Sequence, residues 1–126
     1  MTLSKDNNDA YIAYHYGTPE TIELQYPETL DKLSWDKFIY SFYLRSGGED
    51  NSGMDLNYVS FVNNNYQYII YHTYLAETNE SKVGLIVLDA RSETKTYIKG
   101  KYYTRLGTLT YLRYNQLLEI GDELYD

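Results

Sequence analysis

The residues best suited to contact a partner lie in one polar loop, residues 46–55. Its three glycines allow close backbone approach, and its three acids could meet basic side chains. One interpretation is a loop that enters a cleft of another protein. Another is a solvated hairpin connection, rich in glycine for its geometry alone, and both interpretations stay open. The predicted partner-binding residues are Gly47, Gly48, Glu49, Asp50, Asn51 and Asp55, flanked by Tyr43 and Tyr58 as aromatic anchors.

The same loop offers oxygen atoms that a calcium ion could use, in Glu49, Asp50, Asn51, Ser52 and Asp55. Its spacing departs from the twelve-residue calcium loop. Counting back from the glycine at position 53 places a glycine where the first acidic ligand belongs. We therefore predict no metal here.

Two histidines, His15 and His72, are the remaining candidates for metal binding or proton transfer. Each neighbours a tyrosine on a predicted strand, and no third metal ligand follows at a recognisable spacing. No Gly-x-Ser-x-Gly motif and no phosphate-binding glycine loop occur. Both histidines are expected to be hydrogen-bonded sheet residues, and the chain is predicted to be neither an enzyme nor a cofactor protein.

Tyrosine dominates the aromatic residues, with 17 Tyr against three Phe and one Trp. A tyrosine ring can fill a core or offer contact area at low rotamer entropy, so part of the set should lie near the surface. Such a stripe could anchor a protein or stack on sugar rings, and half of it could equally be core. The candidates are Tyr14, Tyr16, Tyr40, Tyr43, Tyr58, Tyr66, Tyr68, Tyr71 and Tyr74.

The net charge of −7 and the lack of a basic run argue against nucleic acid as the main partner. An acidic domain is better suited to a basic protein, although the charge could simply maintain solubility.

There are no cysteines, so disulfides and thiol chemistry are absent. No apolar run is long enough for a membrane span.

These candidates must be positioned by strands, because apolar residues alternate through most of the chain. We predict strands over residues 10–16, 21–26, 35–45, 56–63, 66–75, 83–88 and 94–99, and a further strand or extended arm over 101–106. Residues 1–9 are expected to be flexible and 76–82 to form a loop. Residues 108–119 are expected to form a short helix, with Leu109, Leu112 and Gln116 on one stripe. The length fits one domain, residues 1–126.

Short strands at regular spacing with little helix predict an all-β, antiparallel fold. The sheet arrangement is expected to be a β-sandwich or a partly open barrel, with the short helix near the C-terminus. The two long strands, 35–45 and 66–75, would be central. Unpaired edges of such strands make a homodimer possible.

Two stretches resemble a family of small uncharacterised bacterial proteins that are exported to the periplasm or carried as lipoproteins. They are residues 14–24 (Tyr-His-Tyr-Gly-Thr-Pro-Glu-Thr-Ile-Glu-Leu) and residues 47–58, and the likeness continues through 68–71 and 84–87. Members of that family often hold cysteines, which this chain lacks. The resemblance implies a periplasmic setting and no catalytic residue. If Met1 is the native start, the alternative is a cytoplasmic protein.

Together these observations predict a non-catalytic bacterial envelope protein that inhibits another protein. The expected partner is basic, either a toxin neutralised by an immunity protein or a wall-degrading hydrolase. The alternative is a module that binds carbohydrate or peptidoglycan fragments through its tyrosine-rich face.

Overall fold

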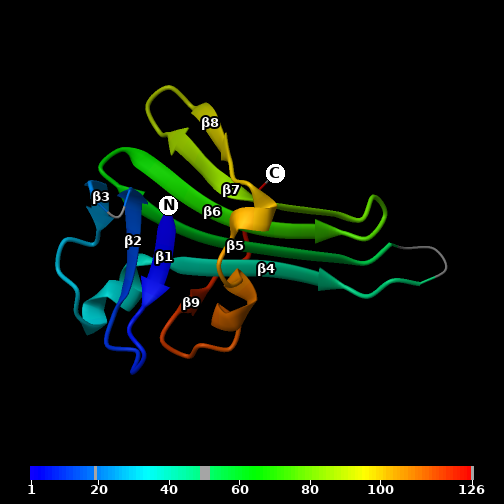
Figure 1. The fold of residues 1–126 in the computed structure, drawn as a ribbon, viewed down its shortest axis with the longest axis horizontal. Coiled ribbons are helices and arrows are strands. Elements are labelled where there is room, and N and C mark those ends of the chain that lie inside the picture. The colour runs from blue at the N-terminus through cyan, green and yellow to red at the C-terminus, as the bar shows by residue number, and fades with distance from the viewer. Residues whose placement is uncertain (19, 49–51, 126) are drawn as a thin grey trace. The chain divides into compact units, whose positions relative to one another are not determined.

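The computed structural model describes residues 1–18, 20–48 and 52–125 (Figure 1). The chain divides into two compact units, residues Met1–Phe38 and Ile39–Asp126. Each unit contains one sheet, and each is described by itself. The expectation of a single domain stays a prediction.

The first unit is a three-stranded antiparallel sheet in the order β1-β2-β3, followed by a 3-10 helix. A side chain links the helix to the sheet, since the backbone N–H of Ile12 donates to Ser34 Oγ at 2.9 Å. The indole of Trp35 donates to the Asp9 carbonyl at 3.0 Å. The elements are β1 (Thr2–Lys5), β2 (Ile12–Gly17), β3 (Ile22–Tyr26) and η1 (Lys32–Lys37).

The N-terminal residues, expected to be flexible, contain the strand β1, which pairs along β2 from Thr2 to Lys5. A hydrogen bond and an ion pair made by local side chains stabilise the turn between these strands. The carboxylate of Asp6 accepts from the backbone N–H of Asn8 at 3.0 Å, and Lys5 lies 2.6 Å from Asp9. Local polar residues therefore order a segment whose composition alone suggests a loose end.

The second unit is a six-stranded sheet in the order β8-β7-β6-β5-β4-β9 (Figure 1). Neighbours are antiparallel except β4 and β9, which are parallel. Asn64, with φ of 59°, lies in the tight turn between β5 and β6, a backbone conformation that asparagine tolerates. The elements are β4 (Ile39–Arg45), β5 (Met54–Asn63), β6 (Tyr66–Leu75), β7 (Glu80–Asp89), β8 (Thr94–Lys99), η2 (Tyr102–Thr104), η3 (Leu109–Leu112) and β9 (Glu119–Ile120).

Register divides the side chains of this sheet between two faces. Tyr40 lies opposite Val59, and Val59 opposite Ile70, so these three share the first face. The second face holds a cluster in which Tyr58, Ile69 and Ile86 are buried, with Leu56, Tyr71 and Tyr125 packed against it. The ring of Tyr125 meets that of Tyr58 edge-on at 5.4 Å, so the acidic C-terminal tail returns to this face.

Gly84 on β7 is needed because a neighbouring strand's ring covers it. A Cβ there would lie 2.6 Å from both the Ile98 carbonyl oxygen and the Tyr71 ring carbon that carries the hydroxyl. Gly84→Ala should therefore lower the free energy of unfolding by about 1–3 kcal/mol, the usual cost of overpacking. Urea denaturation would measure it. Gly48→Ala, where a Cβ meets nothing within 4 Å, is the control, and equal stabilities of the two variants would contradict this account.

The all-β, antiparallel class is confirmed, with open sheets rather than a closed barrel. Several predicted elements differ. Residues 101–106, expected to be a strand or an extended arm, contain the 3-10 helix η2 instead. The strand expected over 35–45 begins at Ile39, because η1 occupies its start, and the predicted loop 76–82 ends early at Glu80, where β7 begins. Residues 108–119 form only the 3-10 turn η3, turns and the first residue of β9. No helix in the described parts of the chain is long and apolar enough to cross a membrane.

Candidate functional site

Residues 101–118, here called the crossing segment, leave the edge strand β8 and end beside β9 at the opposite edge of the second unit's sheet (Figure 1). On the way η2 contacts β7 and η3 contacts β5. The crossing segment has little regular structure of its own. Its position therefore depends on side-chain contacts with the sheet.

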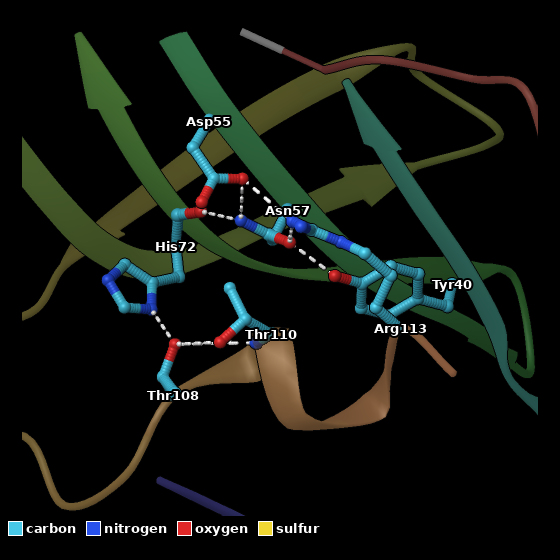
Figure 2. A network of polar contacts seen from close by, with 7 residues as sticks. All are labelled: Tyr40, Asp55, Asn57, His72, Thr108, Thr110 and Arg113. Atoms are coloured by element: carbon cyan, nitrogen blue, oxygen red, sulfur yellow. Dashed lines mark hydrogen bonds and ion pairs between the residues drawn. The ribbon is translucent and has the colours of Figure 1, made fainter. Parts of the chain in front are cut away.

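A buried polar network provides the main contact, centred on Asn57 of β5 (Figure 2). Arg113 of the crossing segment donates to Asp55 Oδ1 at 2.8 Å and to Asn57 Oδ1 at 2.9 Å. Asn57 donates to Asp55 Oδ1 at 3.0 Å and to the His72 carbonyl at 3.3 Å. The phenol of Tyr40 donates to Asn57 Oδ1. Adjacent strands explain this convergence, because Asn57 pairs with His72 across β5 and β6.

Burial of the network strengthens its hydrogen bonds and its ion pair. The Arg113 side chain is only 11% exposed, and its guanidinium lies 4.7 Å from the centre of the Phe42 ring. Burial also raises the pKa of Tyr40, so its phenol stays a neutral donor. Charge-assisted bonds shielded from water are stronger than exposed ion pairs. The Asp55–Asn57–Arg113 group therefore acts as a fixed attachment point for the crossing segment.

A second attachment lies at His72, where Nδ1 is 3.0 Å from the Thr108 hydroxyl (Figure 2). Thr108 begins η3 by accepting from the backbone N–H of Thr110 at 3.3 Å, so the same residue caps the turn and joins it to the sheet. Burial lowers the pKa of His72, the positive charge of Arg105 lowers it further, and Asp55 opposes the shift.

This shift predicts how stability varies with pH. Because the folded state favours neutral His72, its folded pKa lies below the ordinary value of 6.5. The stability that it contributes is complete above about pH 6.5 and is lost as pH falls from there through the folded pKa. Denaturation between about pH 7.5 and 5.5 should show this decline for the natural chain and a flatter profile for His72→Asn. His15→Asn, the matched control, should keep the decline, and an unchanged profile for His72→Asn would contradict the assignment.

The outward side of the crossing segment is unusually apolar and open to solvent. Tyr103 is 97% exposed, Leu106 is 100%, Tyr111 is 80% and Tyr114 is 87%. Single exposed apolar residues are common, but several within one short segment indicate an interaction surface. The contacts of Thr108 with His72 and of Arg113 with Asp55 attach the crossing segment to the sheet at positions close in sequence to these side chains.

The predicted partner-binding residues divide into three groups. Glu49, Asp50 and Asn51 lie outside the described residues. Asp55 is already paired with Arg113, and Tyr58 is 3% exposed in the second-face cluster, so Tyr58 cannot serve as a surface anchor. Gly47, Gly48 and Tyr43 are exposed, Tyr43 at 40%. Within the part of the loop that the structure describes, Asp55 is the residue shared with the network.

The tyrosines of the predicted stripe differ in burial in the folded protein. Tyr14, Tyr40 and Tyr58 are buried, whereas Tyr66 is 43% exposed on β6. The most exposed tyrosines among the described residues are instead Tyr103, Tyr111 and Tyr114 of the crossing segment, and none of these three belongs to the predicted stripe. Tyr16, Tyr68, Tyr71 and Tyr74 are partly buried.

The histidines have the structural roles expected of them. The Nε2 atom of His15 is 3.1 Å from the Gln25 side-chain oxygen across β2 and β3, and His72 contacts Thr108. Among the described residues, no group of three His, Asp or Glu side chains is placed to hold a metal ion.

Sequence reasoning missed Asn57, Thr108 and Arg113, because ordinary residue types scattered over the chain carry no local signal. Comparisons of this chain with family models, with curated proteins and with solved structures found no match.

Proposed function

We propose that this chain is a non-catalytic protein-binding domain that inhibits or neutralises another protein, with the crossing segment as its contact surface. The observation that supports this proposal is the exposure of Tyr103, Leu106, Tyr111 and Tyr114 in a segment that a buried network attaches to the sheet. Aromatic side chains held on a rigid support lose little entropy on binding, which favours affinity. The crossing segment replaces the loop 47–55 in this role, because Asp55 and Tyr58 are engaged within the domain.

The setting of this function remains part of the proposal. The family resemblance favours a bacterial envelope, where an immunity protein would meet a toxin and an inhibitor would meet a wall-degrading hydrolase. In either case the domain acts by covering a functional surface, and needs no catalytic group of its own.

The test combines capture with a map of the contact surface. The purified domain is used to retain proteins from envelope and whole-cell extracts of the source organism, and the complex is then nitrated with tetranitromethane. Protein binding through the crossing segment predicts one stoichiometric partner and protection of Tyr103, Tyr111 and Tyr114 in the complex, with Tyr66 as the unprotected internal control. Failure to retain a protein, or protection elsewhere, would count against the proposal.

The exposed rings also suit a second function, the binding of glycans, because tyrosine rings can stack on sugars. The specific observation is the same set of three highly exposed tyrosines. Affinity for oligosaccharides or peptidoglycan fragments on a glycan array, unaffected by salt, would favour this alternative over protein binding.

A further inference from the structure

The distribution of charge along the chain is uneven. All 18 acidic residues lie outside residues 94–118, a stretch that contains five basic residues: Lys95, Lys99, Lys101, Arg105 and Arg113. The net charge of −7 conceals this basic stretch. A contact responds to charges within about a Debye length, near 10 Å, so the local sign matters more than the total.

The structure places most of these charges on the surface. Every residue of β8 is exposed, which includes Lys95 and Lys99, and Lys101 and Arg105 are exposed on the adjoining crossing segment. Arg105 stacks over the ring of Tyr102 at 4.0 Å, which orients its charge. Only Arg113 is turned inward, where Asp55 neutralises it. Two exposed cations therefore lie on β8, and two more, Lys101 and Arg105, alternate along the crossing segment with the exposed Tyr103 and Leu106.

From this juxtaposition we propose that the crossing segment and β8 bind an acidic, partly apolar segment of a protein partner. This inference rests on the proposed function and specifies the chemistry of its partner. It reverses the sign expected from the net charge, which indicated a basic partner. Carboxylates would meet Lys99, Lys101 and Arg105, and apolar side chains would pack on Tyr111 and Tyr114.

Charge and shape favour a protein segment over other anions. A nucleic acid needs many cations along its length, but acidic residues flank this stretch on both sides, beginning at Glu93 and at Glu119. They would repel a long polyanion beyond the four exposed cations. A short acidic segment can remain within the basic stretch. The exposed tyrosine and leucine side chains also require apolar contacts that a phosphate backbone does not supply.

Binding titrations with designed peptides test whether the crossing segment and β8 prefer an acidic partner. Fluorescein-labelled peptides of repeating Glu-Leu-Asp-Tyr, and neutral peptides of repeating Gln-Leu-Asn-Tyr, are titrated with the full chain at low and high salt, with fluorescence anisotropy as the readout. We expect the acidic peptide to bind at least about tenfold more tightly at low salt, and salt to remove that preference. The double variant Lys99→Glu, Lys101→Glu should weaken acidic-peptide binding by at least about tenfold.

The control is Lys32→Glu, Lys37→Glu, which changes the net charge equally but at exposed positions of η1. Its affinity should stay within about threefold of the natural chain if contact is local. Equal losses in both double variants, or equal affinity for both peptides, would overturn the inference. Stronger binding of a single-stranded oligothymidine, or of vesicles containing phosphatidylserine, would overturn it in favour of those partners.

The inference and the proposed function can fail separately. A captured protein that protects Tyr103, Tyr111 and Tyr114 but binds the Lys99→Glu, Lys101→Glu variant normally would preserve the proposed function and overturn the acidic partner. Loss of tyrosine protection with retained acidic-peptide binding would overturn the proposed surface for that protein while leaving the charge preference in place.

Discussion

Replacement of Arg113 by Met is expected to lower the free energy of unfolding by about 2–3 kcal/mol, since it leaves partners of a buried charge unpaired. Arg113 is only 11% exposed and donates to both Asp55 and Asn57, and Met keeps much of its length without its charge. Asn57 is 2% exposed, so water cannot easily replace the lost donor. Urea denaturation followed by circular dichroism measures the change.

Arg105→Met is the matched control, because it removes an exposed guanidinium from the same crossing segment. Its cost should stay below about 1 kcal/mol. A double-mutant cycle with Asp55→Asn should give a coupling energy of about 1 kcal/mol or more, since Asp55 and Arg113 are in direct contact. If Arg113→Met and Arg105→Met cost the same, the buried network would not be what holds the crossing segment on the sheet.

The second large effect concerns binding. The double variant Tyr111→Ser, Tyr114→Ser should weaken affinity for the captured partner by about a hundredfold, because each exposed aromatic anchor is expected to contribute about 1.4 kcal/mol, a factor of ten, when it becomes buried in an interface. Stability should change by no more than about 0.5 kcal/mol, since the two side chains are 80% and 87% exposed. Isothermal titration calorimetry gives the affinity, and thermal unfolding the stability.

The control for this variant is Tyr43→Ser, Tyr66→Ser, which alters two tyrosines exposed at 40% and 43% outside the crossing segment. Binding by the control variant should be nearly unchanged. If the control loses as much affinity as the test variant, the contact surface lies elsewhere on the domain. If neither variant loses affinity, exposed tyrosines do not contribute to binding.

The strands were largely predictable from the sequence, because side chains two apart on a strand share a face and leave a local pattern. The predicted bounds Tyr66–Leu75 and Thr94–Lys99 match β6 and β8. The residue types between β5 and β6 also suit the turn found there, since asparagine tolerates the positive φ of Asn64.

Elements whose form depends on distant contacts were harder to predict. The leucines of residues 108–119 suggested a helix, but Thr108 bonds to His72 and Arg113 to Asp55, and these contacts hold the chain in a short 3-10 turn. The polar residues at the start of β7 favour a loop, although pairing with β6 extends the strand back to Glu80. In both places tertiary contacts override local preference.

The all-β class, the main strands and the abundance of tyrosine follow from the sequence alone, because strand alternation and composition are local properties. The division of the tyrosines between core and surface depends on tertiary structure, since Tyr58 and Tyr111 look alike in the sequence, yet β5 packs Tyr58 into the second-face cluster and η3 leaves Tyr111 exposed. The tertiary structure also brings Asp55, Asn57 and Arg113 together from separate parts of the chain. Burial and long-range pairing depend on how the sheet is assembled, and no local pattern records that assembly.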